Sequence, residues 1–188
     1  AVDPTTSYAA TTNGLMLLDK KTMDDSDPDL SSWTKGDGLS DIDTAKIYYE
    51  SPHNELIICY VNGNIDIIRN DQLTNVRDVK AKSINSSKRV QNCRFYDGIA
   101  YLVYPFGVVI FDLEEDVVWD TWFTKRENQQ LTPTDIARDR ERFYISTEEG
   151  VFSMSSSSLM LSDFTRWTEE DTREFSFLCA VSEQVVAV

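Results

Sequence analysis

Basic residues are scarce in this sequence, whose 188 residues include 18 lysines and arginines against 32 aspartates and glutamates. The net charge of −14 repels phosphate backbones and anionic bilayers, which argues against nucleic-acid partners and polybasic membrane docking. Long hydrophobic runs are lacking as well, and none approaches the roughly 18 residues of a membrane span. A hydrophobic content of 41% still provides a core. We therefore expect a folded domain without a transmembrane segment.

Histidine and cysteine are almost missing. The one histidine, His53, lies in a Ser-Pro-His-Asn turn, and a single histidine cannot build a histidine-rich zinc site. The three cysteines, Cys59, Cys93 and Cys179, lack paired spacing, so we expect buried thiols in strands rather than disulfides. No P-loop, dinucleotide fingerprint or nucleophile elbow occurs. The sequence predicts no metal, no cofactor and no enzyme activity, although plentiful carboxylates leave a glycosidase-like pair open.

Stretches with a helical period are also absent, and β-hairpins take their place. Residues Glu55–Asp71 read ELIICYVNGNIDIIRND, which is an apolar run, an Asn-Gly turn and a second, alternating run. Asn-Gly between such runs indicates a hairpin, because both residues tolerate positive φ. Similar hairpins recur at spacings of 49 (63 − 14), 44 (107 − 63) and 43 (150 − 107) residues. Their turn glycines are Gly14, Gly63, Gly107 and Gly150.

The hairpins share a hydrophobic pattern. The first strand of each is apolar on both faces, and the second alternates, as Ile65 and Ile67 do in the first example. A strand that is apolar on both faces must be covered on both faces. A repeat of about 40–50 residues built from such hairpins is typical of β-propeller blades, each of which packs between two neighbours.

We therefore predict an all-β fold of four-stranded antiparallel blades in a single domain that spans residues 1–188. The expected hairpins lie at residues 7–19, 55–68, 99–112 and 142–155, and a partial fifth blade lies at 175–188. The other expected segments are the outer strands Leu73–Val79 and Phe164–Thr168 and the crossing loop Lys125–Pro133.

About four blades and a partial fifth make an incomplete ring. The inner strand of the first blade is missing from this prediction, and open blade edges and faces are costly. We expect a fragment of a propeller with about seven blades, at the ~45-residue repeat. The missing blades would come from the rest of a longer chain or from another copy.

The loops that cross between blades are the candidate binding surface, since such loops carry function on a stiff scaffold. Three of them stand out: Gly36–Asp43, Ala81–Arg89 and Lys125–Thr132. The charged residues that could face a ligand are Asp37, Asp41, Asp43, Lys88 and Arg89. A plainer interpretation of Asp41-Ile42-Asp43 is a turn whose carboxylates satisfy its own backbone amides.

Parts of the chain resemble a known family. They are NELIICYVNGNIDII, the crossing Gly38-Leu39-Ser40-Asp41, and INSSKRVQNCRFYDGIAYLVYPFGVVIFDLEED at Ile84–Asp116. These stretches are similar to the N-terminal propeller of PorZ-type proteins, surface components of the type IX secretion system of Bacteroidetes. The family shares its blade pattern with two-component-regulator propellers, the sensing halves of hybrid histidine kinases.

The resemblance implies export across the inner membrane and work in the periplasm or at the outer-membrane surface. It also implies a full propeller followed by a C-terminal sorting-type module. Lipopolysaccharide recognition in the family belongs to that module, so the resemblance does not assign it to these residues. The chain begins with Ala1 and contains no signal peptide, as expected for a processed chain or a cloned fragment.

Three functions follow as hypotheses. The first is a non-catalytic propeller for protein interaction, assembly or ligand binding in a PorZ-like secretion protein. The second is a periplasmic glycan-sensing propeller of a hybrid two-component regulator, which exposed aromatic side chains at the ring centre would favour. The third, less favoured, is a polysaccharide-active propeller enzyme, which two carboxylates about 5–10 Å apart in a central cleft would favour.

Overall fold

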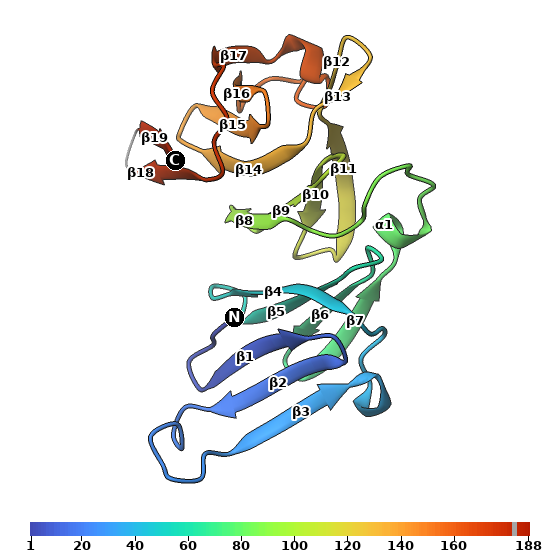
Figure 1. The fold of residues 1–188 in the computed structure, drawn as a ribbon, viewed down its shortest axis with the longest axis vertical. Coiled ribbons are helices and arrows are strands. Elements are labelled where there is room, and N and C mark those ends of the chain that lie inside the picture. Colours follow the sequence, from blue (N-terminus) through green and yellow to red (C-terminus); the bar gives the residue numbers. More distant parts are fainter. Residues whose placement is uncertain (182–183) are drawn as a thin grey trace. The chain divides into compact units, whose positions relative to one another are not determined.

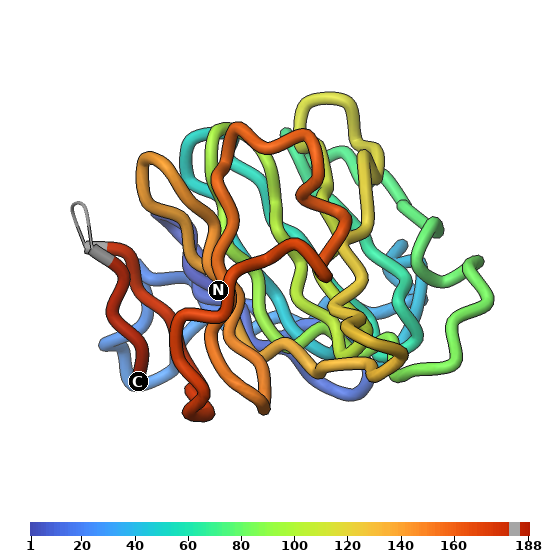
Figure 2. The backbone as a smooth tube through the Cα atoms, turned by 90° about the horizontal axis from the view of Figure 1, so that it is seen from above, coloured from blue at the N-terminus to red at the C-terminus, as the bar shows by residue number. Residues whose placement is uncertain are grey.

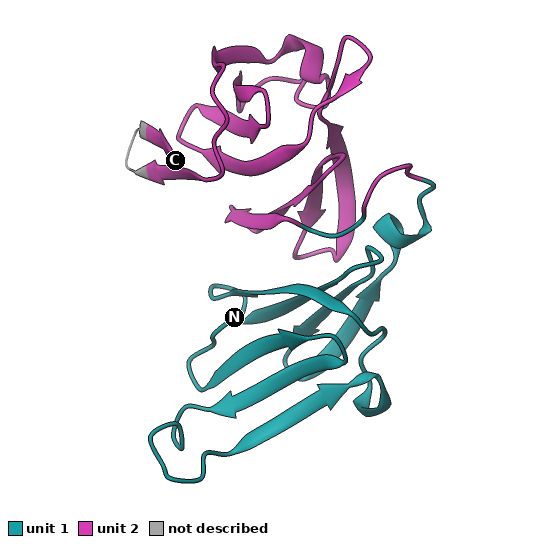
Figure 3. Ribbon diagram, in the orientation of Figure 1, with its two compact units in different colours: residues 1–83, 88–90 teal, residues 84–87, 91–188 magenta. Residues whose placement is uncertain are grey.

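The computed structural model describes residues 1–181 and 184–188, and antiparallel β-strands make up most of its regular structure (Figure 1). The chain divides into two compact units (Figure 3): residues 1–83 with 88–90, and residues 84–87 with 91–188. Within each unit the backbone runs back and forth through successive hairpins (Figure 2). No helix in the described residues is long and apolar enough to cross a membrane.

The first unit contains two blade-type sheets. One has the strand order β1-β2-β3 and the other has the order β4-β5-β6-β7, with every pairing antiparallel. The strands are β1 (Thr6–Thr11), β2 (Gly14–Asp19), β3 (Leu30–Thr34), β4 (Thr44–Glu50), β5 (Glu55–Tyr60), β6 (Ile65–Arg69) and β7 (Gln72–Val76). The two helical turns of this unit are η1 (Lys35–Asp37) and α1 (Asp78–Ala81).

The second unit contains two four-stranded sheets, with orders β8-β9-β10-β11 and β14-β15-β16-β17. The strands of the first are β8 (Asn92–Tyr96), β9 (Ile99–Tyr104), β10 (Gly107–Asp112) and β11 (Val117–Phe123). Those of the second are β14 (Pro133–Arg138), β15 (Arg142–Thr147), β16 (Gly150–Ser155) and β17 (Thr168–Asp171). The remaining elements are β12 (Lys125–Arg126), β13 (Gln129–Gln130), η2 (Phe164–Arg166), β18 (Leu178–Val181) and β19 (Gln184–Ala187).

The predicted all-β architecture of four-stranded blades is confirmed, but three boundaries were wrong. The outer strand predicted at Leu73–Val79 ends at Val76, and α1 follows it. The strand predicted at Phe164–Thr168 is the turn η2, and the true outer strand, β17, begins at Thr168. The loop predicted at Lys125–Pro133 contains the short hairpin β12–β13. Each error lies in or directly next to an outer strand of a blade.

The first blade also has more of its inner strand than the sequence suggested. The backbone of Ala1 exchanges two hydrogen bonds with Tyr8 of β1, at 3.0 and 2.8 Å, and Val2 forms a bridge with Ser7. Ala1 and Val2 therefore occupy the edge of β1 that an inner strand covers in the other blades.

Three of the four predicted turn glycines have the same role, and the fourth differs. Gly14, Gly107 and Gly150 each open the second strand of a hairpin, with φ of 138°, 149° and 145°. Gly63 instead lies inside a longer turn, two residues before β6, with φ of 84°. The Asn62 backbone does not share this positive φ, so only one residue of the Asn-Gly pair uses it.

Two first strands of the hairpins are buried on both faces, as predicted: all residues of β5 are buried, and in β9 only the first residue is partly exposed. The prediction was wrong for β1, in which no residue is buried, and for the second strand β10, which was expected to alternate but is buried throughout. In the second unit a cluster of buried rings and aliphatic side chains joins the β8–β11 blade to the β14–β17 blade. Trp122 and Trp167 belong to this cluster, so both are packing residues.

A buried carboxylate fastens the sheets of the second unit to each other. Asp135, on the inner strand β14, is fully buried. It accepts hydrogen bonds from Asn92 Nδ2 (2.7 Å) and Arg94 Nη2 (2.6 Å) of β8. On its other side it accepts the backbone N–H of Leu178 at the start of β18 (2.9 Å). One side chain therefore connects three consecutive inner strands.

Candidate functional site

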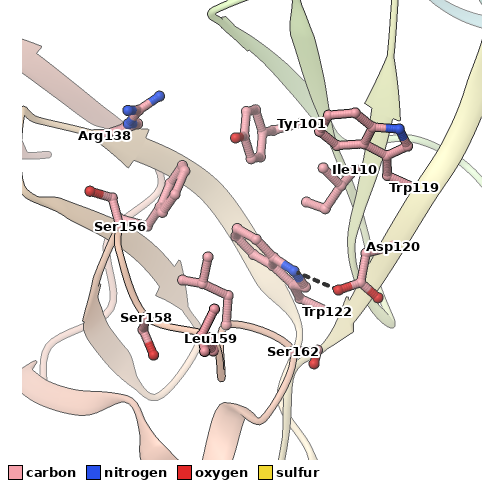
Figure 4. A pocket seen from close by; sticks show the side chains of 12 residues that line it. Tyr101, Ile110, Trp119, Asp120, Trp122, Arg138, Ser156, Ser158, Leu159 and Ser162 are labelled. Carbon is pink, nitrogen blue, oxygen red and sulfur yellow. Dashed lines mark hydrogen bonds between the residues drawn. The ribbon is translucent and has the colours of Figure 1, made fainter. Parts of the chain in front are cut away.

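An aromatic hollow lies between the two four-stranded blades of the second unit (Figure 4). Its volume is about 340 Å³. Blade β8–β11 contributes Tyr101, Ile110, Trp119, Asp120 and Trp122, and blade β14–β17 contributes Arg138, Phe143, Ser156, Ser158, Leu159, Leu161 and Ser162. We call this hollow the aromatic groove.

Three buried rings form the floor of the aromatic groove. The ring centroids of Tyr101 and Phe143 are 5.2 Å apart, and Trp122 lies 5.2 Å from Phe143 and 5.8 Å from Tyr101. Rings at these distances and tilted angles attract each other beyond the area that they bury. The floor is therefore a stiff apolar surface that exists before any ligand arrives.

Trp119 enters the wall of the groove through a β-bulge. Ile110 pairs with Asp120 and Phe111 pairs with Val118, so Trp119 is the extra residue of β11. A bulge re-aims a side chain that a regular strand would place on the other face. The Trp119 side chain is 63% exposed, whereas Trp122 on the same strand is buried.

The facing wall is the serine-rich loop after β16, at whose tip Leu159 is 97% exposed. Backbone hydrogen bonds hold this loop: Ser156 N–H donates to Glu141 O (2.7 Å) and Ser158 N–H donates to Ser155 O (3.0 Å). Met160 N–H donates to the Ser158 hydroxyl (3.1 Å). Leu159 is thus presented to solvent by a fixed loop within the β14–β17 blade.

Polar groups sit at the margins of the groove. Burial raises the pKa of Tyr101, whose hydroxyl faces Arg138 across the hollow (Figure 4). Arg138 pairs with Asp97 (2.6 Å) and lies over the Phe143 ring at 5.3 Å. Asp120 Oδ2 accepts the indole N–H of Trp122 at 3.2 Å. The arrangement can bind an apolar group and a charged one together.

The predicted ligand-facing residues lie elsewhere, in the first unit, and most are engaged in local structure. Asp37 closes a capping box at η1, accepting the N–H and the hydroxyl of Thr34 at 2.9 and 2.7 Å. Asp43 is exposed. Its backbone N–H donates to the carbonyl of Thr12, and its carbonyl accepts the N–H of Val61, which lie in two neighbouring hairpins. These contacts give both residues a structural role, and ligand binding there stays a prediction.

Lys88 and Arg89 flank the second predicted loop. The Lys88 ammonium donates to the carbonyls of Lys80 (2.7 Å) and Lys82 (2.6 Å), at the C-terminal end of α1. A cation there satisfies carbonyls that the helix leaves open. Arg89 is exposed, and its role as a ligand contact stays a prediction.

Asp41 is buried within a polar network rather than presented to solvent. Its Oδ1 accepts the N–H of Ile42 (3.1 Å), as the turn interpretation predicted. Its Oδ2 accepts Asn62 Nδ2 (2.7 Å) and the Lys80 ammonium (2.5 Å). Burial acts to raise the pKa of Asp41, but the bonds from Asn62 and Lys80 outweigh it and lower the pKa to about 2.

This network predicts a pH-dependent stability. Because the pKa of Asp41 falls from 3.8 to about 2 on folding, its stabilisation is present above pH 4 and is lost as the pH approaches 2. Asp41→Asn should therefore unfold at lower urea than the parent at pH 7, and the difference should shrink by pH 3. Asp43→Asn, which removes an exposed carboxylate, is the control. A gap that is constant between pH 7 and pH 3 would contradict the ionic role.

The histidine and the cysteines lie in local structural surroundings. His53 Nδ1 pairs with Glu50 Oε2 at 2.8 Å within its own turn. Cys59 and Cys93 are buried, as predicted, while Cys179 is partly exposed, and burial raises the pKa of Cys59 to about 12. Among the described residues, no three histidine, cysteine or acidic side chains gather in a way that could hold a metal ion.

The sequence analysis missed the aromatic groove. The alternation in VVWDTWF does not reveal which residue is extra, and the bulge depends on pairing with β10. The sequence signal that could have indicated the groove is the pair Leu159–Met160 directly after four serines. Large apolar residues in an otherwise polar loop often mark a binding surface.

Comparisons with known proteins identify the family of the chain. Residues 7–168 match the family model described as the N-terminal β-propeller domain of PorZ of the type IX secretion system. No curated protein sequence matches the chain. The match covers far more than half of the chain, and it agrees with the resemblance found in the sequence.

Solved structures show the same fold. PorZ of Porphyromonas gingivalis, described as an essential bacterial surface component of its type IX secretion system, matches with a TM-score of 0.83 at 23% identity. That match covers 100% of this chain and 25% of the other. The extracellular domain of the putative one-component system BT4673 from B. thetaiotaomicron matches with a TM-score of 0.63 at 15% identity, covering 94% and 23%. The WD40 propeller domain of Doa1 matches with a TM-score of 0.63 at 11% identity, covering 100% and 59%.

Proposed function

Since the chain belongs to the family of PorZ N-terminal β-propeller domains, we propose that it is a non-catalytic assembly domain of a type IX secretion protein, and that it holds a protein partner at the aromatic groove. We further propose that the protein is exported and works in the periplasm or at the outer-membrane surface. PorZ of P. gingivalis, itself described as a surface component, supports that location.

The single observation that carries the proposal is the exposure of Trp119 and Leu159 on opposite walls of one stiff hollow. Exposing large apolar side chains to water is unfavourable in free energy for the free protein, so such exposure is typical of binding surfaces. Tryptophan is prominent among the residues that contribute most to binding at interfaces. Buried carboxylates such as Asp135 and Asp66 are occupied by hydrogen bonds within the fold, which supports a scaffold rather than an enzyme.

The test replaces Trp119 with serine in the full-length protein at its native locus. We expect the affinity for secretion-system proteins that co-purify with the parent to fall about 30-fold, because truncating a hot-spot residue costs 2 kcal/mol or more. Secretion of type IX cargo should fall with it. The measurements are quantitative co-purification and the amount of cargo in the medium.

A matched control removes an exposed aliphatic side chain elsewhere. Leu30, on β3, is 54% exposed, and Leu30→Ser should leave both partner binding and secretion unchanged. Equal amounts of each variant at the cell surface, with unchanged melting temperature, exclude misfolding. Unaltered co-purification and secretion in the Trp119→Ser strain would refute the proposal.

A further inference from the structure

The size of the aromatic groove limits what it can take. At about 340 Å³ it lies at the lower end of the range of ligand pockets, which suits one large side chain rather than an extended ligand. Its floor is three rings, and its walls include Ile110, Leu159 and Leu161. Ile110 on one side and Leu159 and Leu161 on the other would contact an apolar side chain that enters between the blades.

The Asp120 carboxylate at the rim of the groove is the second feature that determines which ligand fits. Arg138 is already paired with Asp97, but within residues 1–181 and 184–188 no lysine or arginine pairs with Asp120. Its contacts are the Trp122 indole N–H and the N–H of Thr121, and the carboxylate is otherwise exposed beside Trp119. On a chain with a net charge of −14, this uncompensated anion attracts a cation.

We propose that the aromatic groove recognises a basic segment of a protein partner, in which one apolar side chain enters between Trp119 and Leu159 and an adjacent lysine or arginine pairs with Asp120. The inference deepens the assembly role proposed above and rests on it. Both walls exist in the free protein, Trp119 through its bulge and Leu159 through the hydrogen bonds of its loop. Binding therefore loses little free energy to ordering the groove.

The probes are three fluorescent peptides of twelve residues in a Gly-Ser background, with Phe-Lys, Phe-Glu or Ser-Lys at the centre. They are titrated against the full-length protein by fluorescence polarisation. We expect Phe-Lys to bind at least threefold more tightly than Phe-Glu, with the difference vanishing in 1 M salt. Ser-Lys should bind at least tenfold more weakly than Phe-Lys, because it lacks the anchor.

Variants of Asp120 test the charge directly. Asp120→Asn keeps an acceptor for the Trp122 indole and should abolish the preference for Phe-Lys. Asp120→Lys should invert it, so that Phe-Glu becomes the tighter peptide. An inverted preference is a gain that a destabilised protein cannot produce.

The outcomes separate this inference from the assembly role. Equal binding of Phe-Lys and Phe-Glu that Trp119→Ser abolishes would overturn the basic partner and leave the groove as a protein-binding site. Failure of all three peptides to bind would also overturn the inference, while the secretion phenotype of Trp119→Ser would still report on the assembly role. Displacement of Phe-Lys by an oligosaccharide such as maltohexaose would overturn both, in favour of a glycan site.

Discussion

Replacing Asp135 with alanine should destabilise the second unit by about 3–5 kcal/mol, which is the usual cost of removing one partner of a buried ion pair. The Arg94 guanidinium, 2.6 Å from the carboxylate, would lose its counter-ion, and Asn92 Nδ2 and the Leu178 N–H would lose their acceptor. Burial acts to lower the pKa of Arg94, but Asp135 outweighs it and raises that pKa. Arginine is so strongly basic that the guanidinium stays charged without Asp135, and it would then be a cation without its partner. The measurement is the urea midpoint, followed by tryptophan fluorescence.

The control is a second aspartate–arginine pair of equal length. Asp97 lies 2.6 Å from Arg138, but its side chain is 78% exposed. Asp97 has a φ of 53°, which asparagine tolerates better than alanine. Asp97→Asn should therefore cost less than about 1 kcal/mol, because solvent screens an exposed pair. Comparable losses from Asp135→Ala and Asp97→Asn would show that burial and the three-strand connection contribute nothing.

The contact between Asp135 and the neighbouring inner strands could have been predicted from the sequence, by aligning equivalent positions of successive repeats. Asn92 precedes Gly107 by 15 residues, and Asp135 precedes Gly150 by the same interval. Leu178 follows Asp135 by a further 43 residues. The same position in successive blades therefore meets at one point, because inner strands of neighbouring blades contact each other. The spacing of the repeat along the chain predicts the strands. Comparing equivalent positions in successive blades also predicts which residues of neighbouring inner strands are in contact.

The aromatic groove could not be found in this way. It depends on one extra residue in β11 and on the course of the loop after β16, and neither follows the repeat. Hairpins such as β5–β6 and β9–β10 were predictable because both faces of β5 and β9 are covered, a condition that their apolar sequences record. Bulges and loops depend on partners across the sheet, so local alternation does not determine which way Trp119 points.

The hairpin glycines differ in a way that substitution should expose. At Gly107, φ is +149°, and an added Cβ would lie 2.1 Å from the carbonyl oxygen of Trp122 and 2.9 Å from Phe123 Cα. The obstacle is the backbone of β11, which cannot rotate away as a side chain can. Gly107→Ala should therefore cost more than about 3 kcal/mol in urea unfolding, since backbone strain and a clash combine.

Substitutions of two further glycines separate the effect of backbone strain from that of the clash. Gly38 has φ of +116° with nothing within 4 Å of an added Cβ, so Gly38→Ala should show the strain alone, about 1–2 kcal/mol. Gly36 has neither problem, its nearest atom being Thr34 Oγ1 at 3.5 Å, and Gly36→Ala should be neutral or slightly stabilising. If Gly107→Ala costs no more than Gly38→Ala, the close approach of β11 adds nothing, and the glycine is kept for its φ alone. A larger loss at Gly107 shows instead that these glycines let the outer strand of the blade lie directly against the start of the second hairpin strand.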